Sequence, residues 1–305
     1  KYKLLNIDKV GYASTPEKFK IIKNKKNYSF SKLDICKYQK LEVRLKKFKP
    51  DLIINLAANS HVDKSITSPK KFYNENIFIT QNILEWLRHN REVKLIHIST
   101  DEVYGSIKKS FFNEKSILDP SSPYSASKAS TDLLIKSYTK TYNLKSCILR
   151  FCNNFGPYQF TEKFIPTIIS RIFENKSIPV YGKGKNVREW IHVDDTCRAI
   201  ERFILKFKND EIYNIGSNYC YNNITVVKNI LKMFSEKKSC KIVYVRDRAA
   251  HDFRYALDSN KVKKFQKFKT KVSFISGIKN TINWYESNKT WINNTKKKYQ
   301  GQRQG

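Results

Sequence analysis

Short apolar runs alternate with long amphipathic segments through the first half of this chain, and this alternation constrains the fold most strongly. The runs have the length of buried strands, and the longer segments have the apolar spacing of helices. The predicted strands are 51–58, 94–100 and 146–150, and the predicted helices are 38–49, 69–90 and 125–142. Strands that alternate with helices predict βαβ units, so we expect an α/β, doubly wound fold with a parallel sheet.

The pattern becomes irregular after residue 151, where prolines and glycines are interspersed. We therefore expect one main domain at 1–150 and a smaller lobe, mainly 151–305, that caps the crevice of the main domain. A strand near 211–215 is expected to return to the main sheet. The polar segment 289–305 is expected to fray.

Three polar side chains follow the predicted strand 94–100 directly. Thr100 is a hydroxyl residue, and Asp101 and Glu102 are adjacent acids. Ligands of a doubly wound sheet bind at the carboxyl ends of its strands. Tyr124 and Lys128 are one helical turn apart on one face of the next helix, and the ammonium favours the phenolate, so the tyrosine can act as a base. The sequence thus predicts a hydroxyl, two acids and a base in one crevice.

The composition argues against nucleic-acid-binding, membrane-spanning and metal-binding proteins. The 305-residue chain has 59 Lys and Arg against 27 Asp and Glu, a formal net charge of +32. The lysines are spread through every segment, so we expect a lysine-biased surface and no nucleic acid as partner. No apolar run has the length of a membrane span. The six cysteines show no Cys-x-x-Cys spacing and the five histidines no His-Glu-x-x-His spacing, so we expect reduced thiols, a cytoplasmic location and no metal.

An ordered set of motifs along the chain resembles the extended short-chain dehydrogenase/reductase family, and within it the dTDP-glucose 4,6-dehydratase branch. The most specific match is Ser-Thr-Asp-Glu-Val-Tyr-Gly at 99–105. The other matching stretches are 56–63, 122–129, 153–157, 162–166, 181–184, 188–190, 213–216 and 247–255. The resemblance implies a Rossmann-like NAD-binding domain at 1–150 and a substrate-binding lobe after it.

The beginning of the chain departs from the family pattern. Asp8 follows a short apolar strand, as the acid does that ends the second strand of a dinucleotide fold and bonds the adenosine ribose. No glycine-rich loop precedes it, so we expect the family's first strand, its glycine loop and its first helix to be absent from this sequence. Asn59 stands where the family usually has Glu or Gln, and Glu75 where it often has a small hydroxyl residue.

The resemblance also implies roles for individual residues. The implied catalytic residues are Thr100, Asp101, Glu102, Tyr124 and Lys128. The implied cofactor-binding residues are Asp8, Lys9, Asp34, Ile35, Leu56, Ala57, Ala58, Ser60, Tyr124, Lys128 and Asn154. The implied substrate-binding residues are Ser60, Thr100, Asn153, Lys163, Phe164, Pro179, Tyr181, Arg188, Asn223, Arg248 and His251. His97 and His192 are expected to lie in the core.

The reaction implied is the dehydration of dTDP-glucose to its 4-keto-6-deoxy product, by C4 oxidation, elimination across C5 and C6, and C6 reduction with NAD. That product feeds deoxysugar pathways such as rhamnose synthesis. The family pairs the two long helices between subunits, so a homodimer is expected. Two alternatives stay open: another sugar-nucleotide epimerase, dehydratase or decarboxylase on the same scaffold, or a catalytically inert relative that acts as a binding protein.

Overall fold

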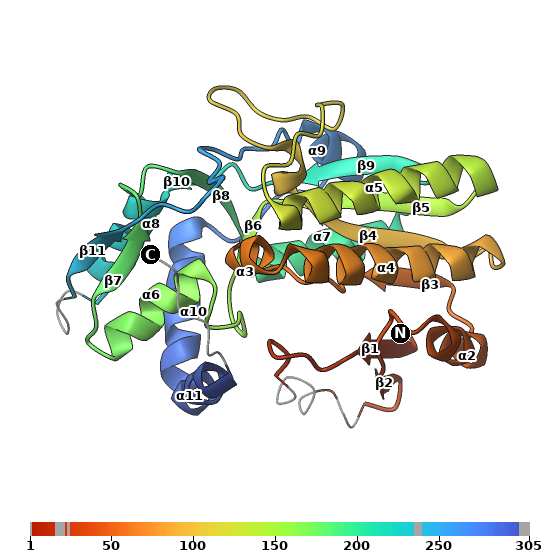
Figure 1. Cartoon of the computed structure of the whole chain (residues 1–305), viewed down its shortest axis with the longest axis horizontal. Helices are drawn as coiled ribbons and strands as arrows, with labels where there is room; N and C mark the ends of the chain where they lie inside the picture. Colours follow the sequence, from red (N-terminus) through yellow and green to blue (C-terminus); the bar gives the residue numbers. More distant parts are fainter. Residues whose placement is uncertain (1, 16–21, 23–24, 235–239, 299–305) are drawn as a thin grey trace.

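A computed structural model describes residues 2–15, 22, 25–234 and 240–298. Its main sheet has four parallel strands in the order β3-β4-β5-β9, as Figure 1 shows. The strands are β3 (Leu52–Asn55), β4 (Lys94–Thr100), β5 (Lys145–Phe151) and β9 (Glu211–Ile215). The predicted parallel α/β sheet is therefore confirmed. β9 lies beside β5 although it is far from it in sequence.

Helices cover both faces of this sheet because consecutive strand residues point to opposite sides. Leu95 packs in a cluster with α4 (Pro69–Arg88) and α5 (Pro123–Tyr142). Ile96, the next residue, packs in a cluster with α7 (Val193–Leu205). The fold is thus doubly wound, and α4 and α5 lie side by side on one face (Figure 1).

The start of α5 is fixed by its local sequence. Ser122 and Ser125 form a reciprocal capping box, in which the Ser122 side chain accepts from the Ser125 N–H at 3.1 Å. Pro123 occupies the first turn, where its missing N–H costs nothing. This cap places Tyr124 in the first turn of the helix, and Lys128 follows one turn later.

A second, smaller lobe follows the main domain and contains two further sheets. In one, β8 (Val187–His192) pairs with β6 (Asn153–Phe155) and β10 (Cys220–Asn222); in the other, β7 (Ile178–Tyr181) pairs with β11 (Ile242–Val245). Its helices are α6 (Phe164–Phe173), α8 (Asn223–Lys232), α10 (Phe274–Ser287) and α11 (Lys289–Lys298). One buried apolar cluster joins these elements, so the lobe has a core of its own.

The remaining elements lie at the edges of the main domain or connect its strands. β1 (Leu4–Asp8) and β2 (Tyr28–Lys32) form a separate two-stranded parallel sheet. The others are α2 (Tyr38–Phe48), α3 (Val62–Thr67), the 3-10 helix η1 (Asp101–Tyr104) and α9 (Asn260–Gln266). Among the described residues no helix could cross a membrane, and no cluster of His, Cys, Asp or Glu could hold a metal ion.

Two sequence predictions were wrong at their boundaries. The strand predicted at 51–58 ends at Asn55, where its pairing with β4 ends, and Leu56 is 62% exposed. The segment predicted to fray from residue 289 instead forms α11, because Trp291 and Ile292 are buried against the core of the second lobe. Residues 299–305 lie outside the described part of the chain.

Candidate active site at the end of β4

The carboxyl end of β4 carries three adjacent polar side chains. Thr100 caps η1: its hydroxyl accepts from the Glu102 N–H at 3.3 Å and donates to Asp101 Oδ1 at 3.1 Å. Gly105 ends the motif at φ 74°, and a Cβ there would lie 2.2 Å from the Asp119 carbonyl oxygen. Glycine is therefore required to turn the chain at this point, and the turn fixes where the two acids lie.

The side chains of Tyr124 and Lys128 are both buried. Lys128 Nζ donates to the carbonyl oxygen of Ile98 on β4 at 2.8 Å and lies 3.1 Å from His97 Nε2. These contacts tie the helix to the strand that carries the acids. The structure thus places the two predicted groups, strand end and helix, against each other.

The two acids sit in different electrostatic surroundings. Burial raises the pKa of Asp101 well above its usual value, and the charges of Glu102 and Glu189 raise it further. Burial also raises the pKa of Glu102, but the charges of Arg248, Arg188 and Lys163 oppose that shift. Burial therefore favours the protonated form of both acids, and it does so more strongly at Asp101, because several basic side chains oppose the shift at Glu102.

Burial shifts the phenol of Tyr124 and the amine of Lys128 each toward its own neutral form. Burial raises the pKa of Tyr124, and the charges of Glu102 and Asp101 raise it further. Burial lowers the pKa of Lys128 to about 8, against the opposing charge of Asp132. Lys128 can therefore change its protonation state near neutral pH.

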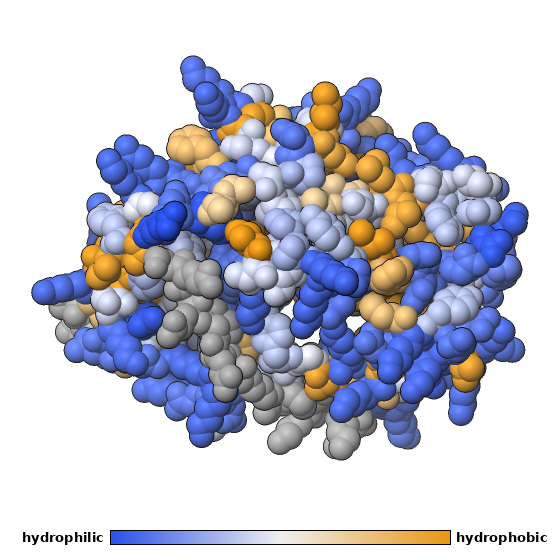
Figure 2. All heavy atoms as spheres, in the orientation of Figure 1, coloured by the Kyte–Doolittle hydropathy of each residue, from blue (hydrophilic) through white to orange (hydrophobic). Residues whose placement is uncertain are grey.

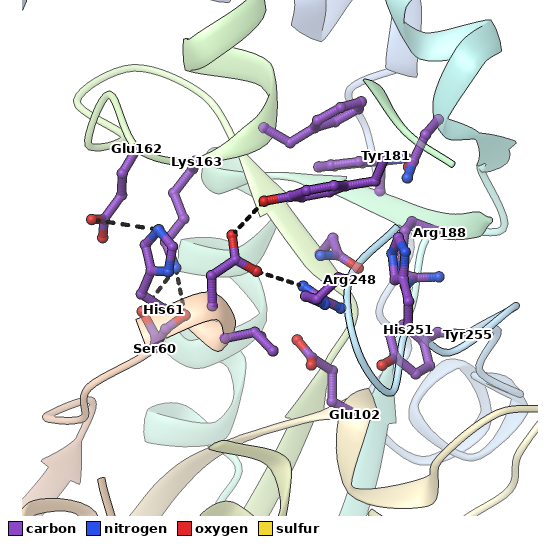
Figure 3. Close-up of a pocket in the computed structure, with 16 residues that line it drawn as sticks. Ser60, His61, Glu102, Glu162, Lys163, Tyr181, Arg188, Arg248, His251 and Tyr255 are labelled. Atoms are coloured by element: carbon purple, nitrogen blue, oxygen red, sulfur yellow. Dashed lines mark hydrogen bonds and ion pairs between the residues drawn. The ribbon is translucent and has the colours of Figure 1, made fainter. Parts of the chain in front are cut away.

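A cavity of about 160 Å³ opens between the end of β4 and the second lobe. Glu102 lines it from the main domain, and Figure 3 shows Glu102 and Arg248 pointing toward the same space. The other lining residues are Ser60, His61, Val62, Asp63, Asn153, Glu162, Lys163, Phe164, Tyr181, Arg188, Trp190, Asn223, His251 and Tyr255. The cavity thus brings together one acid of β4 and basic and aromatic side chains of the second lobe.

Asp63 makes two contacts across this cavity. Its Oδ2 accepts from the Tyr181 hydroxyl at 3.0 Å, and its Oδ1 lies 3.4 Å from Arg248 Nη1. Arg188 stacks over the Tyr255 ring, with its guanidinium carbon 4.1 Å from the ring centroid. Two guanidinium groups therefore lie at the cavity, and one of them pairs with an acid of the chain itself.

Lys163 and Glu162 connect the second lobe to the loop after β3. Lys163 Nζ donates to the Ser60 carbonyl oxygen at 2.5 Å and to its hydroxyl at 3.1 Å. The buried Glu162 lies near His61 and Lys64, at 3.7 and 3.3 Å, and accepts from the Tyr12 hydroxyl at 2.9 Å. Charged groups thus fix the position of this wall of the cavity.

Most of the predicted substrate-binding residues line the cavity. Thr100 lies behind Glu102 at the strand end, and Pro179 is on β7, so these two are not among the lining residues. The buried Asn153 Oδ1 has no hydrogen-bond partner among the described residues, as expected of an acceptor that a ligand hydroxyl would satisfy.

Sequence reasoning did not select six of the lining residues as site residues: His61, Val62, Asp63, Glu162, Trp190 and Tyr255. Each lies inside a stretch that carries the family resemblance. The signal was therefore present, but an ordinary core or surface role fitted each residue equally well.

The predicted cofactor-binding residues lie along one side of the main domain. Asp8 ends β1, where its Oδ1 accepts from the Val10 N–H at 2.5 Å, and Lys9 pairs with Glu75. Leu56, Ala57 and Ala58 follow β3 directly. The remaining positions are Asp34 and Ile35 after β2, Ser60 before α3, and Asn154 in β6, where its amide bonds Thr196 and the Cys152 carbonyl oxygen.

Comparison with known proteins gives a consistent result. Residues 2–281 match the model of the GDP-mannose 4,6 dehydratase family. The dTDP-glucose 4,6-dehydratase of Salmonella typhimurium is 38% identical over 318 residues, which cover 96% of this chain and 88% of that protein. The comparison therefore does not support the expectation that this sequence lacks elements of the family.

Two solved structures share the fold over nearly the whole chain. The dTDP-glucose 4,6-dehydratase of Streptomyces venezuelae, with NAD and TYD bound, superposes with a TM-score of 0.92 at 36% identity and covers 96% of this chain and 90% of its own. The dTDP-glucose 4,6-dehydratase of Bacillus anthracis, in complex with NAD, gives 0.89 at 39% identity, with 96% and 91% covered.

Proposed function

The chain belongs to the dTDP-glucose 4,6-dehydratase family, and from that premise we propose that it converts dTDP-glucose to dTDP-4-keto-6-deoxyglucose with NAD as its cofactor. The observation that carries this proposal is the pair Asp101 and Glu102 at the end of β4, beside Tyr124 and Lys128 and open to a cavity with basic walls. Elimination of water needs one acid and one base, and the two carboxyls are held in different electrostatic surroundings.

The residues present fit a dinucleotide. Leu56 follows β3 and is apolar yet 62% exposed, which suits a side chain that a ring of the cofactor would cover. Asp8 ends β1, and its carboxylate accepts from the N–H of Val10 in the loop that follows. The predicted cofactor-binding residues would hold the NAD. When bound, NAD supplies the reversible hydride acceptor that oxidises C4 and later reduces C6.

We assign the proton steps to individual side chains. Tyr124 acts as the phenolate, which the charge of Lys128 stabilises; it takes the proton of the C4 hydroxyl and becomes the neutral phenol. Thr100 holds that hydroxyl in place. Glu102, in its carboxylate form, which Arg248, Arg188 and Lys163 stabilise, removes the C5 proton once C4 is a ketone, and C5 regains a proton when C6 is reduced. Asp101, kept protonated by burial, gives its proton to the C6 hydroxyl that leaves as water. The net reaction is loss of one water from the sugar.

The second lobe would hold the nucleotide end of the substrate. Arg188 and Arg248 suit a diphosphate, since planar guanidinium groups bind phosphate oxygens in pairs. Arg248 now pairs with Asp63, so a bound diphosphate would displace that acid from it. Lys163, Asn153, Phe164, Tyr181, Asn223 and His251 complete the assigned wall. We accordingly assign 1–150 to cofactor binding and 151–305 mainly to substrate binding.

Turnover against several nucleotide sugars tests the proposal. The purified protein, with NAD added, is incubated separately with dTDP-glucose, UDP-glucose and GDP-mannose, and the products are analysed by mass spectrometry. We expect loss of one water from dTDP-glucose, with deuterium from solvent at C5. An isomer of unchanged mass would instead identify an epimerase. No turnover of any substrate, with no NAD bound, would favour the inert binding protein.

We also propose a homodimer formed through α4 and α5. Tyr73 and Phe78 on α4 and Leu133 on α5 are 36, 47 and 56% exposed, and apolar residues gather over these helices in Figure 2, while most of that face is hydrophilic. Exposed apolar side chains on adjacent helices suit a helical interface. Light scattering should give twice the chain mass, and Leu133→Asp should give a monomer. A wild-type monomer at micromolar concentration would contradict the proposal.

The six cysteines are free thiols, which supports the proposed cytoplasmic location.

A further inference from the structure

A segment of the main domain crosses to the second lobe beside the cavity. Residues 9–15 follow β1, and within them the Tyr12 hydroxyl donates to Glu162 Oε1 at 2.9 Å, although these two residues are 150 positions apart. The Tyr12 ring also packs edge-on against the Phe160 ring, with 5.8 Å between the centroids. In Figure 1 the dark red segment after β1 runs toward the loop that precedes α6. The two lobes are therefore joined at this point.

Asp8 fixes the shape of this segment. Its Oδ1 accepts from the Val10 N–H at 2.5 Å and from the Ser14 hydroxyl at 3.0 Å. The Ser14 N–H also donates to the Gly11 carbonyl oxygen at 3.0 Å. The chain on both sides of Tyr12 is thus folded around one carboxylate. Because Asp8 is assigned to the ribose of the cofactor, a ligand on Asp8 would order the segment that presents Tyr12.

Glu162 also receives a second segment of the main domain. His61 Nε2 lies 3.7 Å and Lys64 Nζ 3.3 Å from Glu162 Oε2. Burial lowers the pKa of His61 to about 4, so the imidazole is neutral at neutral pH, and Lys64 supplies a positive charge at Glu162. Lys64 Nζ also lies 3.6 Å from the centroid of the Tyr12 ring, within the range of a cation–π contact. We call this contact of Tyr12, Lys64 and Glu162 the interlobe clamp.

The interlobe clamp adjoins both proposed binding regions. The stretch 56–60, which includes most of the cofactor residues after β3, lies shortly before Lys64 in the chain, and Lys163, assigned to the substrate, directly follows Glu162. Lys163 itself donates to Ser60, so the same wall of the cavity holds both regions (Figure 3). The Glu162 side chain is only 3% exposed, and its carboxylate therefore depends on these protein partners rather than on water.

We propose that Tyr12 and Glu162 are positioning residues that couple the two sites, so that a bound dinucleotide raises the affinity for the nucleotide sugar and the nucleotide sugar raises the affinity for the dinucleotide. A ligand on Asp8 orders the segment that carries Tyr12, and a ligand on Lys163 orders the residue next to Glu162. Each ligand thus helps to form a contact that the other also needs, and the coupling is equal in both directions. This coupling rests on the proposed function.

Such coupling suits a reaction in which one cofactor is first the oxidant and then the reductant. The dehydration has no net redox change, so loss of the reduced cofactor in mid-reaction would leave the keto intermediate unreduced. A nucleotide sugar that tightens the hold on the cofactor through the interlobe clamp prevents this loss until the product has left.

The first test needs no ligand. Hydrogen–deuterium exchange of the free protein reports whether the Tyr12 hydroxyl holds the segment 9–15. Tyr12→Phe keeps the ring but removes the hydrogen bond to a carboxylate, so the amides of 9–15 should exchange about tenfold faster. Tyr244→Phe, at a tyrosine on β11 that is 58% exposed, is the matched control and should leave them unchanged. Unchanged exchange in Tyr12→Phe would overturn the proposal.

The second test measures the coupling itself. dTDP is titrated calorimetrically into the protein with and without saturating NAD. We expect NAD to lower the Kd of dTDP about tenfold in the wild type and in Tyr244→Phe, but less than about threefold in Tyr12→Phe and in Glu162→Gln. The double variant should lose no more coupling than either single variant, because both changes remove the same contact.

A purely structural role would weaken the binding of both ligands and leave the effect of NAD on dTDP unchanged, and that result would overturn the proposal. The outcomes also separate this coupling from the proposed reaction. A protein that dehydrates dTDP-glucose while NAD has no effect on the Kd of dTDP would refute the coupling alone. Coupled binding without a dehydrated product would refute the reaction alone.

Discussion

Replacing Glu102 with Gln removes the proposed C5 base and little else. The amide has nearly the shape of the carboxylate, and Arg248, Arg188 and Lys163 remain around it. The variant should therefore still bind the nucleotide sugar and carry out the first step at C4. It should stop before the C5 proton is removed.

The size of the effect follows from the role assigned. A positioned general base contributes about 10²–10⁴ in rate, which is about 3–5 kcal/mol of transition-state stabilisation. The cationic groups that balance Glu102 would lose their anion and be more available to a diphosphate. We therefore expect kcat to fall about 10²–10⁴-fold and KM to stay equal or fall.

Stopped-flow absorbance in the reduced nicotinamide band, after mixing with dTDP-glucose, reports the blocked step. The signal should rise to a stable plateau in Glu102→Gln and remain low in the wild type. Glu201→Gln, at an exposed acid on α7, is the matched control and should behave as the wild type. Normal deuterium incorporation at C5 in Glu102→Gln would refute the assignment of the base.

Three further predictions use other parts of the site and its support. Tyr124→Phe should abolish turnover with no reduced nicotinamide signal, since the C4 step needs the phenolate oxygen of Tyr124 to take a proton; a signal equal to that of Glu102→Gln would contradict this. Asp132→Asn leaves the buried Arg150 without its anion and should cost about 3–5 kcal/mol in urea unfolding, whereas the double variant Asp132→Leu/Arg150→Met should recover much of it; a loss below about 1 kcal/mol would refute the argument. Burial lowers the pKa of His251 to about 4. On acidification the unfolded chain therefore binds a proton at this residue from about pH 6.5, whereas the folded chain binds it only near pH 4. Stability should therefore fall through that window by up to about 3 kcal/mol from this group, and the fall should be smaller in His251→Gln; equal falls would refute it.

The sequence predicted the main sheet well because its strands are fully buried. The run 94–100 matches β4 residue for residue, and the helix predicted at 125–142 begins only two residues early, at a capped Pro123. Strand ends were harder: nothing in Leu56-Ala-Ala indicates that the pairing with β4 has already stopped. A continuous apolar run predicts a strand along its whole length, and its true end is set by the pairing with the neighbouring strand.

The contacts within the site could not be predicted in the same way. Lys163 reaches Ser60, and Tyr181 reaches Asp63, over separations of 103 and 118 residues. Sequence motifs identify such residues individually, but only the packing of the two lobes shows which of them are in contact. For the same reason His97 was expected to be an ordinary core residue, since its partners Asn55 and Thr131 come from distant segments.

The cavity has one wall from the end of β4 and another from β7, β8 and the segment 245–255, and this division bears on how such a protein could be altered. The groups that would break and form bonds are carried by one continuous segment, 100–128. The groups that would recognise the nucleotide come from later, separate segments of the chain, which pack on a core of their own. Exchanging 178–192 and 245–255 for those of a relative would therefore retarget the enzyme to a different nucleotide while its reaction stayed the same.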